Sequence, residues 1–451
     1  MFYLWMPTLI NSDWFLDLLS AEAEKLIDKL KERPQYVLDV PQDWWITGLP
    51  KPLNEKTIVY AVDGGGGIQP LAGGGAIYVA RAFAYAPNQE PERLLELRFY
   101  PTRDTRVLDV LRSWLEHRVA IRIVLKKQPP VLLIDGSYRA TLLTAIATIY
   151  RAASSHPHTL SVLYAALLSM ELLITVEELA RLAFENNVAI AYISKDHAYR
   201  VLKEKILLET IAQVKPRLRK LIEQALAWYP LGEREKLLAI RRELEIRERS
   251  LLDAALDMSY RDAQFIVDTI GVTIGFTLPL RVPPPYQLHK ISTYVGLKRI
   301  VERLCSNIEK YLGDNEASIC WTNADRFVTA LDQLPAPLFT YVRLDPNDTP
   351  LLAEFFASPG SIHSPGRILE EPSETIERVL AALVRDYAGP DYYNIPLIAA
   401  HLNATLSGSQ MAAYMRLLEN LAAARGLQLK FARRSIIGHR LSRVKKRRIL
   451  H

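Results

Sequence analysis

The chain has 451 residues, 49% hydrophobic and 24% charged, a composition that indicates a globular protein and excludes a disordered one. The length suits one large domain or two to three ordinary ones. The net charge of +6 is uneven, because residues 430–451 contain nine Lys or Arg and no acid, which leaves −3 for the remainder. The two cysteines, Cys305 and Cys320, exclude a disulfide framework and a cysteine-type zinc site. They could pair with each other, but we expect two reduced thiols of a cytosolic protein.

We expect a cytoplasmic protein with no membrane segment. The first six residues have no basic leader. The most apolar run, Val162–Val176, is interrupted by Glu171 and is too short to span a bilayer, so we interpret it as a buried helix.

Residues 1–56 are predicted to form a lead-in. An amphipathic helix is expected over about residues 11–33. Several prolines then favour an extended chain, at positions Pro34, Pro41, Pro50 and Pro52.

Two short β-branched runs, Thr57–Val62 and Val131–Ile134, are each followed by Asp-Gly, at Asp63 and Asp135. Such runs predict strands buried on both faces. A charged Asp at the end of a buried strand is unfavourable unless it is paired, hydrogen-bonded or bound to a cation. Two of them suggest carboxylates that meet at one end of a sheet and hold a divalent metal. The alternative is two ordinary Asp-Gly turns.

Between these strands, residues 107–124 carry apolar side chains at helical spacing. Glu116 lies near the edge of the apolar stripe. Asp63, Glu116 and Asp135 would therefore form a carboxylate trio, a ligand set that suits magnesium or manganese.

Glycines fill positions 64–67 and 73–75, before a second predicted strand at 76–86. They could suggest a phosphate cradle, but no Gly-Lys-Ser/Thr ending follows, which excludes a Walker-type loop. We expect a hairpin with these glycines at its tip.

Residues 140–183 have a helical pattern, and a further buried strand, 187–193, leads to Lys195. That lysine could reach a phosphate or an attacking water, or it could extend its ammonium into solvent. The charge-rich stretch 198–257, broken at Pro216 and Pro230, predicts an inserted helical arm. The arm would pack against a second copy or form a solvated hairpin.

Short strands are predicted at 275–282 and 339–344, and a helix from 393 to about 425 carries His401, a residue that is usually structural in such a place. The basic C-terminal tail suggests contact with nucleic acid through its phosphates, the alternative being a solvated terminus. Its cations are Lys430, Arg433, Arg434, Arg440, Arg443, Lys445, Lys446, Arg447 and Arg448.

The strands and helices together predict an α/β fold, compatible with an RNase H-like core in which helices flank a mixed sheet. In that architecture strand-end acids gather two metals roughly 3.5–4 Å apart. The expected division is a lead-in at 1–56, a core at 57–197 and 258–429, the arm at 198–257 and the tail at 430–451.

The order of several motifs resembles the NurA nuclease family over about residues 57–425. These motifs are Ala-Val-Asp63-Gly, Leu115-Glu116, Leu-Ile-Asp135-Gly-Ser, Ile-Ser194-Lys195-Asp, Gly275-Phe-Thr-Leu-Pro-Leu, Tyr341-Val-Arg-Leu and Ile-Pro-Leu-Ile-Ala-Ala-His401. The resemblance implies an RNase H-like core, a homodimer, and DNA cleavage that depends on Mn²⁺ or Mg²⁺. It also implies 5′-to-3′ exonuclease and single-strand endonuclease activity, in double-strand break resection with the hexameric HerA helicase-translocase.

By the same resemblance Asp63, Glu116 and Asp135 would be metal ligands. The site would be completed by Lys195, which could stabilise the transition state or orient the attacking water. Tyr341 could stack on a base or bind a phosphate. His401 could protonate the leaving oxygen or touch a metal-bound water.

Three departures from the family pattern stand out. Asp63-Gly-Gly replaces the usual Asp-Gly-Ser, and the glycines at 64–75 are expanded. The Arg-x-Glu that tends to follow the tyrosine motif is reduced to Leu351-Leu-Ala-Glu354, which argues against a role for Glu354. Two other functions remain open. One is an actin- or hexokinase-like ATPase on the same core, and the other is a non-catalytic DNA-binding scaffold.

Overall fold

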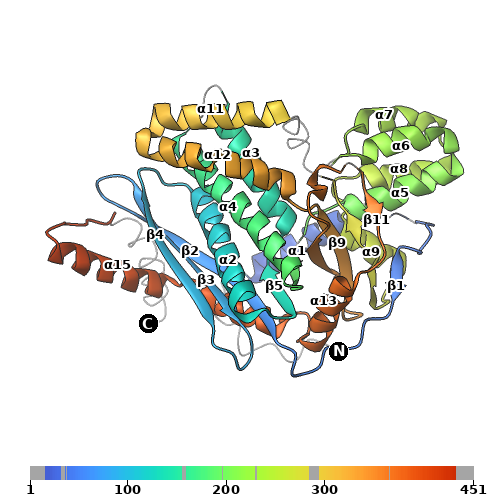
Figure 1. The fold of residues 1–451 in the computed structure, drawn as a ribbon. Coiled ribbons are helices and arrows are strands. Elements are labelled where there is room, and N and C mark those ends of the chain that lie inside the picture. The colour runs from blue at the N-terminus through green and yellow to red at the C-terminus, as the bar shows by residue number, and fades with distance from the viewer. Residues whose placement is uncertain are drawn as a thin grey trace.

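The computed structural model describes residues 16–31, 36, 38–154, 159–195, 197–228, 231–283, 294–364 and 366–432. Within these residues a mixed sheet runs through the molecule, with helices on both faces (Figure 1). The tail from residue 433 onward and the predicted start of the N-terminal helix lie outside the described residues.

The strands follow the order β1-β7-β9-β10-β6-β5-β2-β3-β4, with β8 paired to β9 and β11 to β8. The central strands β2, β5 and β6 are parallel, and the strands on either side join them antiparallel. Their bounds are β1 Trp45–Thr47, β2 Val59–Pro70, β3 Ala76–Tyr85, β4 Glu92–Tyr100, β5 Val131–Asp135, β6 Ala189–Ser194, β7 Gly275–Thr277, β8 Leu280–Arg281, β9 Pro337–Arg343, β10 Leu351–Phe356 and β11 Ile368–Leu369.

The helices form one layer on each face of the sheet and a group, α5 to α9, beside it. Helices α2, α3 and α4 cover one face of the sheet, with α11 and α12 packed outside α4, and α13 and α14 cover the other face. Their bounds are α1 Leu16–Lys31, α2 Thr105–Lys127, α3 Tyr138–Ala152, α4 Leu160–Glu185, α5 Val201–Val214, α6 Arg219–Leu226, α7 Arg234–Ala239, α8 Ile246–Leu256, α9 Asp262–Ile270, α11 Tyr294–Leu312, α12 Asp314–Gln333, α13 Glu374–Arg385, α14 Ile395–Ala404 and α15 Gly408–Ala424. Short 3₁₀ turns are η1 Pro216–Leu218, η2 Ile240–Glu243 and η3 Ser361–His363.

The apolar segments that precede Asp63 in β2 and Asp135 in β5 are buried on both faces, as their composition predicts. Val62 and Ile134 are register partners and pack beneath α2, whereas Ala61 and Leu133 are partners that face α14. Because β2 and β5 run parallel and their pairing ends at Val62 and Ile134, the aspartates that follow these two residues lie next to each other.

The expectation that glycines 64–67 form a hairpin tip is wrong. Strand β2 continues through them to Pro70, and each pairs with β3, from Gly64 with Ala82 onward. A β-carbon on Gly64 would collide with Glu116 of α2, and one on Gly65 would collide with the carbonyl oxygen of Ala404 in α14. The absence of side chains therefore lets two helices approach one strand from opposite faces.

Two helix predictions need correction. Helix α4 has 26 residues and is long and apolar enough to cross a membrane, so the argument from a short run is wrong. However, 83% of its most apolar window is buried inside the protein, which confirms the buried-helix interpretation. The helix predicted over 393–425 is two helices, because Thr405 is extended and Ser407 begins α15 with a reciprocal capping box.

The cysteines are also not the reduced thiols that we expect from the sequence. Helices α11 and α12 form a hairpin around Gly313, and Cys305 and Cys320 face each other across it in a disulfide. Their Cα atoms lie 5.5 Å apart, within the range that a disulfide requires. The fold brings the two together because they lie at similar distances on either side of the turn.

The predicted arm is helical, and α5 to α8 project to one side of the sheet (Figure 1). Many of its charged residues are exposed, although Lys203, Glu204 and Glu248 are buried. Its inner faces and α9 enclose a second apolar cluster, which includes Leu207, Leu252 and Phe265. That cluster continues onto β9 through Phe339 and Tyr341. The arm is therefore packed against the sheet rather than being a solvated hairpin.

Candidate metal and phosphodiester site

Three side chains from distant parts of the chain converge at the end of the central strands. Asp63 lies on β2 just beyond its pairing with β5, Asp135 ends β5, and His401 comes from α14. His401 Nδ1 lies 2.7 Å from Asp63 Oδ2, although the two residues are 338 positions apart. One potential ligand atom from each of the three lies within 4.8 Å of the others.

Two side chains position His401 by binding the two ends of its helix, α14. Asn394 caps the start of α14, since its side chain accepts a hydrogen bond from Leu397 N at 3.1 Å. At the other end Arg81 of β3 donates to the carbonyl of Ala404 at 2.7 Å and also to the carbonyl of Thr405. The last carbonyls of a helix have no N–H partner within the helix, and Arg81 supplies the hydrogen bonds that they lack.

Glu116 approaches the same place from the opposite face of the sheet. It is 7% exposed on α2 and lies against Gly64. Burial raises the pKa of Glu116 to about 8, with further repulsion from Asp63 and Asp135, while Arg112 opposes the rise. The Nε atom of Arg112 lies 3.5 Å from Glu116 Oε1. Glu116 therefore lies close enough to interact electrostatically with Asp63 and Asp135, but it is not one of the three residues whose ligand atoms lie within 4.8 Å of one another.

Burial also raises the pKa of Asp135, and the charge of Asp63 adds to the effect. Lys195, His401 and Tyr393 act in the opposite direction. Three acids that repel one another around a histidine form a donor set that suits a divalent cation, because oxygen and imidazole nitrogen atoms are its usual ligands. The residues present therefore fit a divalent metal on the chemistry of their side chains alone.

Lys195 lies beside this group, as expected from its place after β6. Its Nζ atom is 3.6 Å from the ring centroid of Tyr393, and the side chain is exposed. The hydroxyl of Tyr393 donates to Asp135 Oδ2 at 3.3 Å. Lys195 is thereby held near the acids by a cation–π contact, and its charge acts on Asp135.

Tyr341 does not lie with the acids. Tyr341 is fully buried in the cluster beneath the helical arm, and its hydroxyl donates to Asp262 at 2.6 Å. Tyr393 lies beside the acids, and a signal was present, because it stands two residues before the motif Ile395–His401. Glu354 is buried and does not line the cavity, but it accepts hydrogen bonds from the cavity-lining Ser137 and, at 2.7 Å, from a backbone N–H of α3. Burial raises the pKa of Glu354 to about 7.

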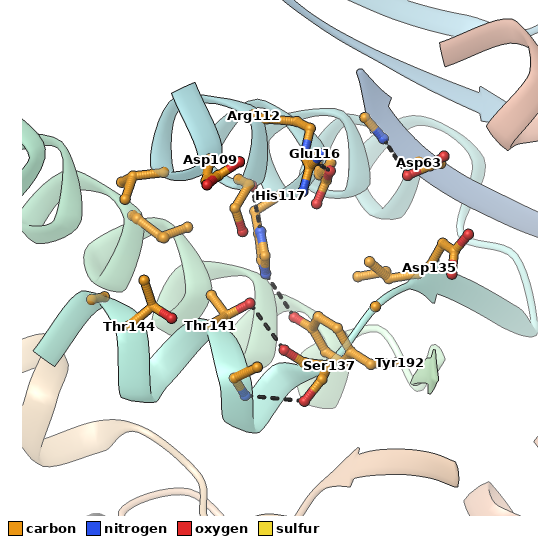
Figure 2. Close-up of a pocket in the computed structure, with 18 of the residues that line it drawn as sticks. Asp63, Asp109, Arg112, Glu116, His117, Asp135, Ser137, Thr141, Thr144 and Tyr192 are labelled. Atoms are coloured by element: carbon orange, nitrogen blue, oxygen red, sulfur yellow. Dashed lines mark hydrogen bonds and ion pairs between the residues drawn. The ribbon is translucent and has the colours of Figure 1, made fainter. Parts of the chain in front are cut away.

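The acids open into a cavity of about 390 Å³ between α2 and α3. Figure 2 shows Asp63 and Asp135 at one end, with Asp109 and Thr144 at the other. His117 lies in its wall, where its ring nitrogens are 2.7 Å from Ser113 O and 2.8 Å from Tyr192 Oη. Burial lowers the pKa of His117 to about 4. The candidate site is therefore an open pocket with a strongly acidic end.

The protein has a mixed α/β fold. Where the parallel pairing of β2 and β5 ends, two aspartates and a histidine lie together and open into a cavity. These features define a protein with a candidate divalent-metal site. The sequence model described as the NurA domain matches residues 57–406. This match covers most of the chain, and the chain belongs to the NurA family.

Solved structures give more distant similarities. The NurA nuclease from Sulfolobus solfataricus is 13% identical, with 90% of this chain and 95% of that chain covered and a TM-score of 0.46. Endonuclease V from Ciona intestinalis, in complex with a 24mer DNA containing an inosine followed by a ribo-adenosine, is 14% identical. That alignment covers 45% of this chain and 68% of that chain, with a TM-score of 0.16. None of the curated proteins matches the chain.

Proposed function

We propose that this protein is a DNA nuclease that depends on a divalent metal, Mn²⁺ or Mg²⁺. Membership of the NurA family supports a DNA nuclease. The observation that carries the proposal is the convergence of Asp63, Asp135 and His401, with Glu116 facing them across Gly64. Such a group is unfavourable without a cation, since its carboxylates repel one another.

The roles of the side chains follow from their charge and position. Asp63, Asp135 and His401 would hold the cation, with Glu116 available from the α2 side. A divalent cation there would supply charge neutralisation at a phosphodiester and would lower the pKa of a bound water. Lys195 brings a positive charge to the same end of the cavity and would stabilise negative charge that develops on the phosphate oxygens. Tyr393 orients Asp135 through its hydroxyl.

An RNase H-like core is part of this proposal. Three antiparallel strands, β4, β3 and β2, are followed by the parallel strands β5 and β6, and α2 crosses between β4 and β5. This order agrees with the hairpin, helix and parallel strand expected of that architecture.

The decisive experiment is digestion of end-labelled DNA by the purified protein with Mn²⁺, with Mg²⁺ and with EDTA. We expect cleavage with a metal and none with EDTA. Absence of cleavage with either metal would refute the proposal and favour the non-catalytic scaffold. Measurable ATP turnover in place of DNA cleavage would instead favour the ATPase alternative. Single- and double-stranded substrates labelled at either end would test the proposed 5′-to-3′ exonuclease and single-strand endonuclease activities.

The proposed biological setting is resection of DNA double-strand breaks by a cytoplasmic homodimer that works with a hexameric HerA-type translocase. The support for this setting is the family itself. Light scattering at micromolar concentration tests the dimer, and a monomer there would exclude it. Co-elution with the cognate translocase tests the partnership, and separate elution of the two proteins would count against it.

A further inference from the structure

The cavity continues well past the acids, and the cation site does not account for this part. It runs between α2 and α3 from Asp135 toward Thr144, as Figure 2 shows. The whole cavity, about 390 Å³, falls within the roughly 300–1,000 Å³ typical of sites for small ligands. A metal and a phosphate fill only the acidic end, so the remainder has room for another part of a substrate. We call this remainder the α2–α3 slot.

The charges along the slot disfavour a second phosphate. Among the described residues that line the cavity, Arg112 is the one permanent cation, and it already lies 3.5 Å from Glu116. Asp109 adds an exposed acid at the far end. A phosphate inside the slot would face acids at both ends, and like charges repel. The slot is therefore suited to an uncharged group.

The walls combine small side chains, apolar contacts and hydrogen-bond acceptors. Ala140 and Ala145 of α3 leave the space open, and Leu172 adds an apolar surface. Thr141 donates its hydroxyl proton to the carbonyl of Ser137 at 3.0 Å, so its oxygen offers only lone pairs to a ligand. Together with the carboxylate of Asp109, these acceptors match the amino and imino N–H groups on the edges of nucleobases.

We propose that the α2–α3 slot binds the nucleoside moiety next to the phosphodiester that is cleaved. This inference rests on the proposed nuclease function and adds a substrate subsite to it. A base that enters a slot between two helices cannot remain paired or stacked in a duplex. The nucleotide at the cleavage point must therefore be unpaired, which requires single-stranded DNA or a frayed end.

Calorimetric titration of the full chain in Ca²⁺ tests the slot without relying on turnover. The probes are thymidine 5′-monophosphate, thymidine 3′-monophosphate and inorganic phosphate. We expect at least one nucleotide to bind about tenfold more tightly than inorganic phosphate, a difference in affinity that only the nucleoside can supply. Ala140→Phe, a change at an exposed position that fills the slot, should abolish this advantage and leave phosphate binding unchanged.

Two matched variants complete the test. Thr144→Phe closes the slot from its far end and should act like Ala140→Phe, whereas Ala412→Phe, an exposed alanine on α15 outside the cavity, should bind like the wild type. Equal affinities for nucleotide and phosphate, or an advantage that survives Ala140→Phe, would overturn the slot. Thermal unfolding of each variant verifies that the fold is retained.

Hydrolysis in Mn²⁺ separates failure of the slot from failure of the proposed function. Ala140→Phe should slow hydrolysis of the p-nitrophenyl ester of thymidine 5′-phosphate but not that of bis(p-nitrophenyl) phosphate, which has no nucleoside. Nucleotide binding that depends on the slot, in a protein that cleaves no DNA, would support the slot and refute the nuclease. DNA cleavage unaffected by Ala140→Phe would support the nuclease and refute the slot.

Discussion

Replacing Glu116 by glutamine is expected to stabilise the metal-free protein at neutral pH and to impair cleavage. Glu116 is buried, and burial together with repulsion from Asp63 and Asp135 raises its pKa from the ordinary 4.5 to about 8. Glutamine has nearly the same shape and no charge. It should therefore keep the packing of α2 against Gly64 and remove an ionisable group that the fold disfavours when ionised.

The size of the effect follows from the difference between the two pKa values. The folded state keeps a proton that the unfolded chain releases near pH 4.5, so the stability of the wild type falls as pH rises from there toward about 8. At pH 7 the gap is about 2.5 pH units, and at about 1.4 kcal/mol per unit the loss is about 3 kcal/mol. Glutamine does not titrate, so the variant should escape this loss.

Urea unfolding in EDTA at pH 5, 7 and 8.5 measures the prediction. The stability difference between Glu116→Gln and the wild type should grow with pH and reach about 3 kcal/mol in favour of the variant at pH 7. Asp109→Asn, which removes an exposed acid from the same helix, should change stability by no more than about 0.5 kcal/mol. A difference that stays constant from pH 5 to 8.5 would show that Glu116 does not titrate as the structure indicates.

Asp63→Asn and Asp135→Asn should each reduce cleavage at least roughly a thousandfold, because each removes a carboxylate from the cation site. End-labelled DNA digestion measures this loss, and near-wild-type rates in either variant would remove that residue from the site. Gly65→Ala should destabilise the protein by about 1–3 kcal/mol, since its β-carbon collides with the carbonyl of Ala404. The same variant should lower activity by displacing α14, whereas full activity would show that α14 tolerates the shift. Deleting residues 433–451 should weaken DNA binding and reduce its salt slope by about 3 to 4 units if half of the eight cations touch phosphates. An unchanged slope in a filter-binding titration would exclude a phosphate-binding tail.

Local sequence pattern determined the acidic end of the site. A β-branched run followed by Asp-Gly encodes a buried strand segment and a charged residue directly after it, and it does so twice, at Asp63 and Asp135, although β2 continues past Asp63. Helical spacing around Glu116 placed a third acid on a buried helix face. These inferences needed only periodicity and the energetic penalty of burying charge, which are properties of short segments.

The tertiary structure alone decided which distant segments meet these acids. Tyr341 and Tyr393 both lie next to apolar stretches, and nothing local shows that one enters the core under the arm while the other reaches Asp135. The glycines after Asp63 looked like a turn, because glycine is common in turns, yet they serve the close approach of two helices. His401 meets Asp63 across 338 positions only because α14 rests on Gly65 and is held by Arg81. Periodicity encodes which face of an element is buried, but the partner of that face depends on packing over the whole chain.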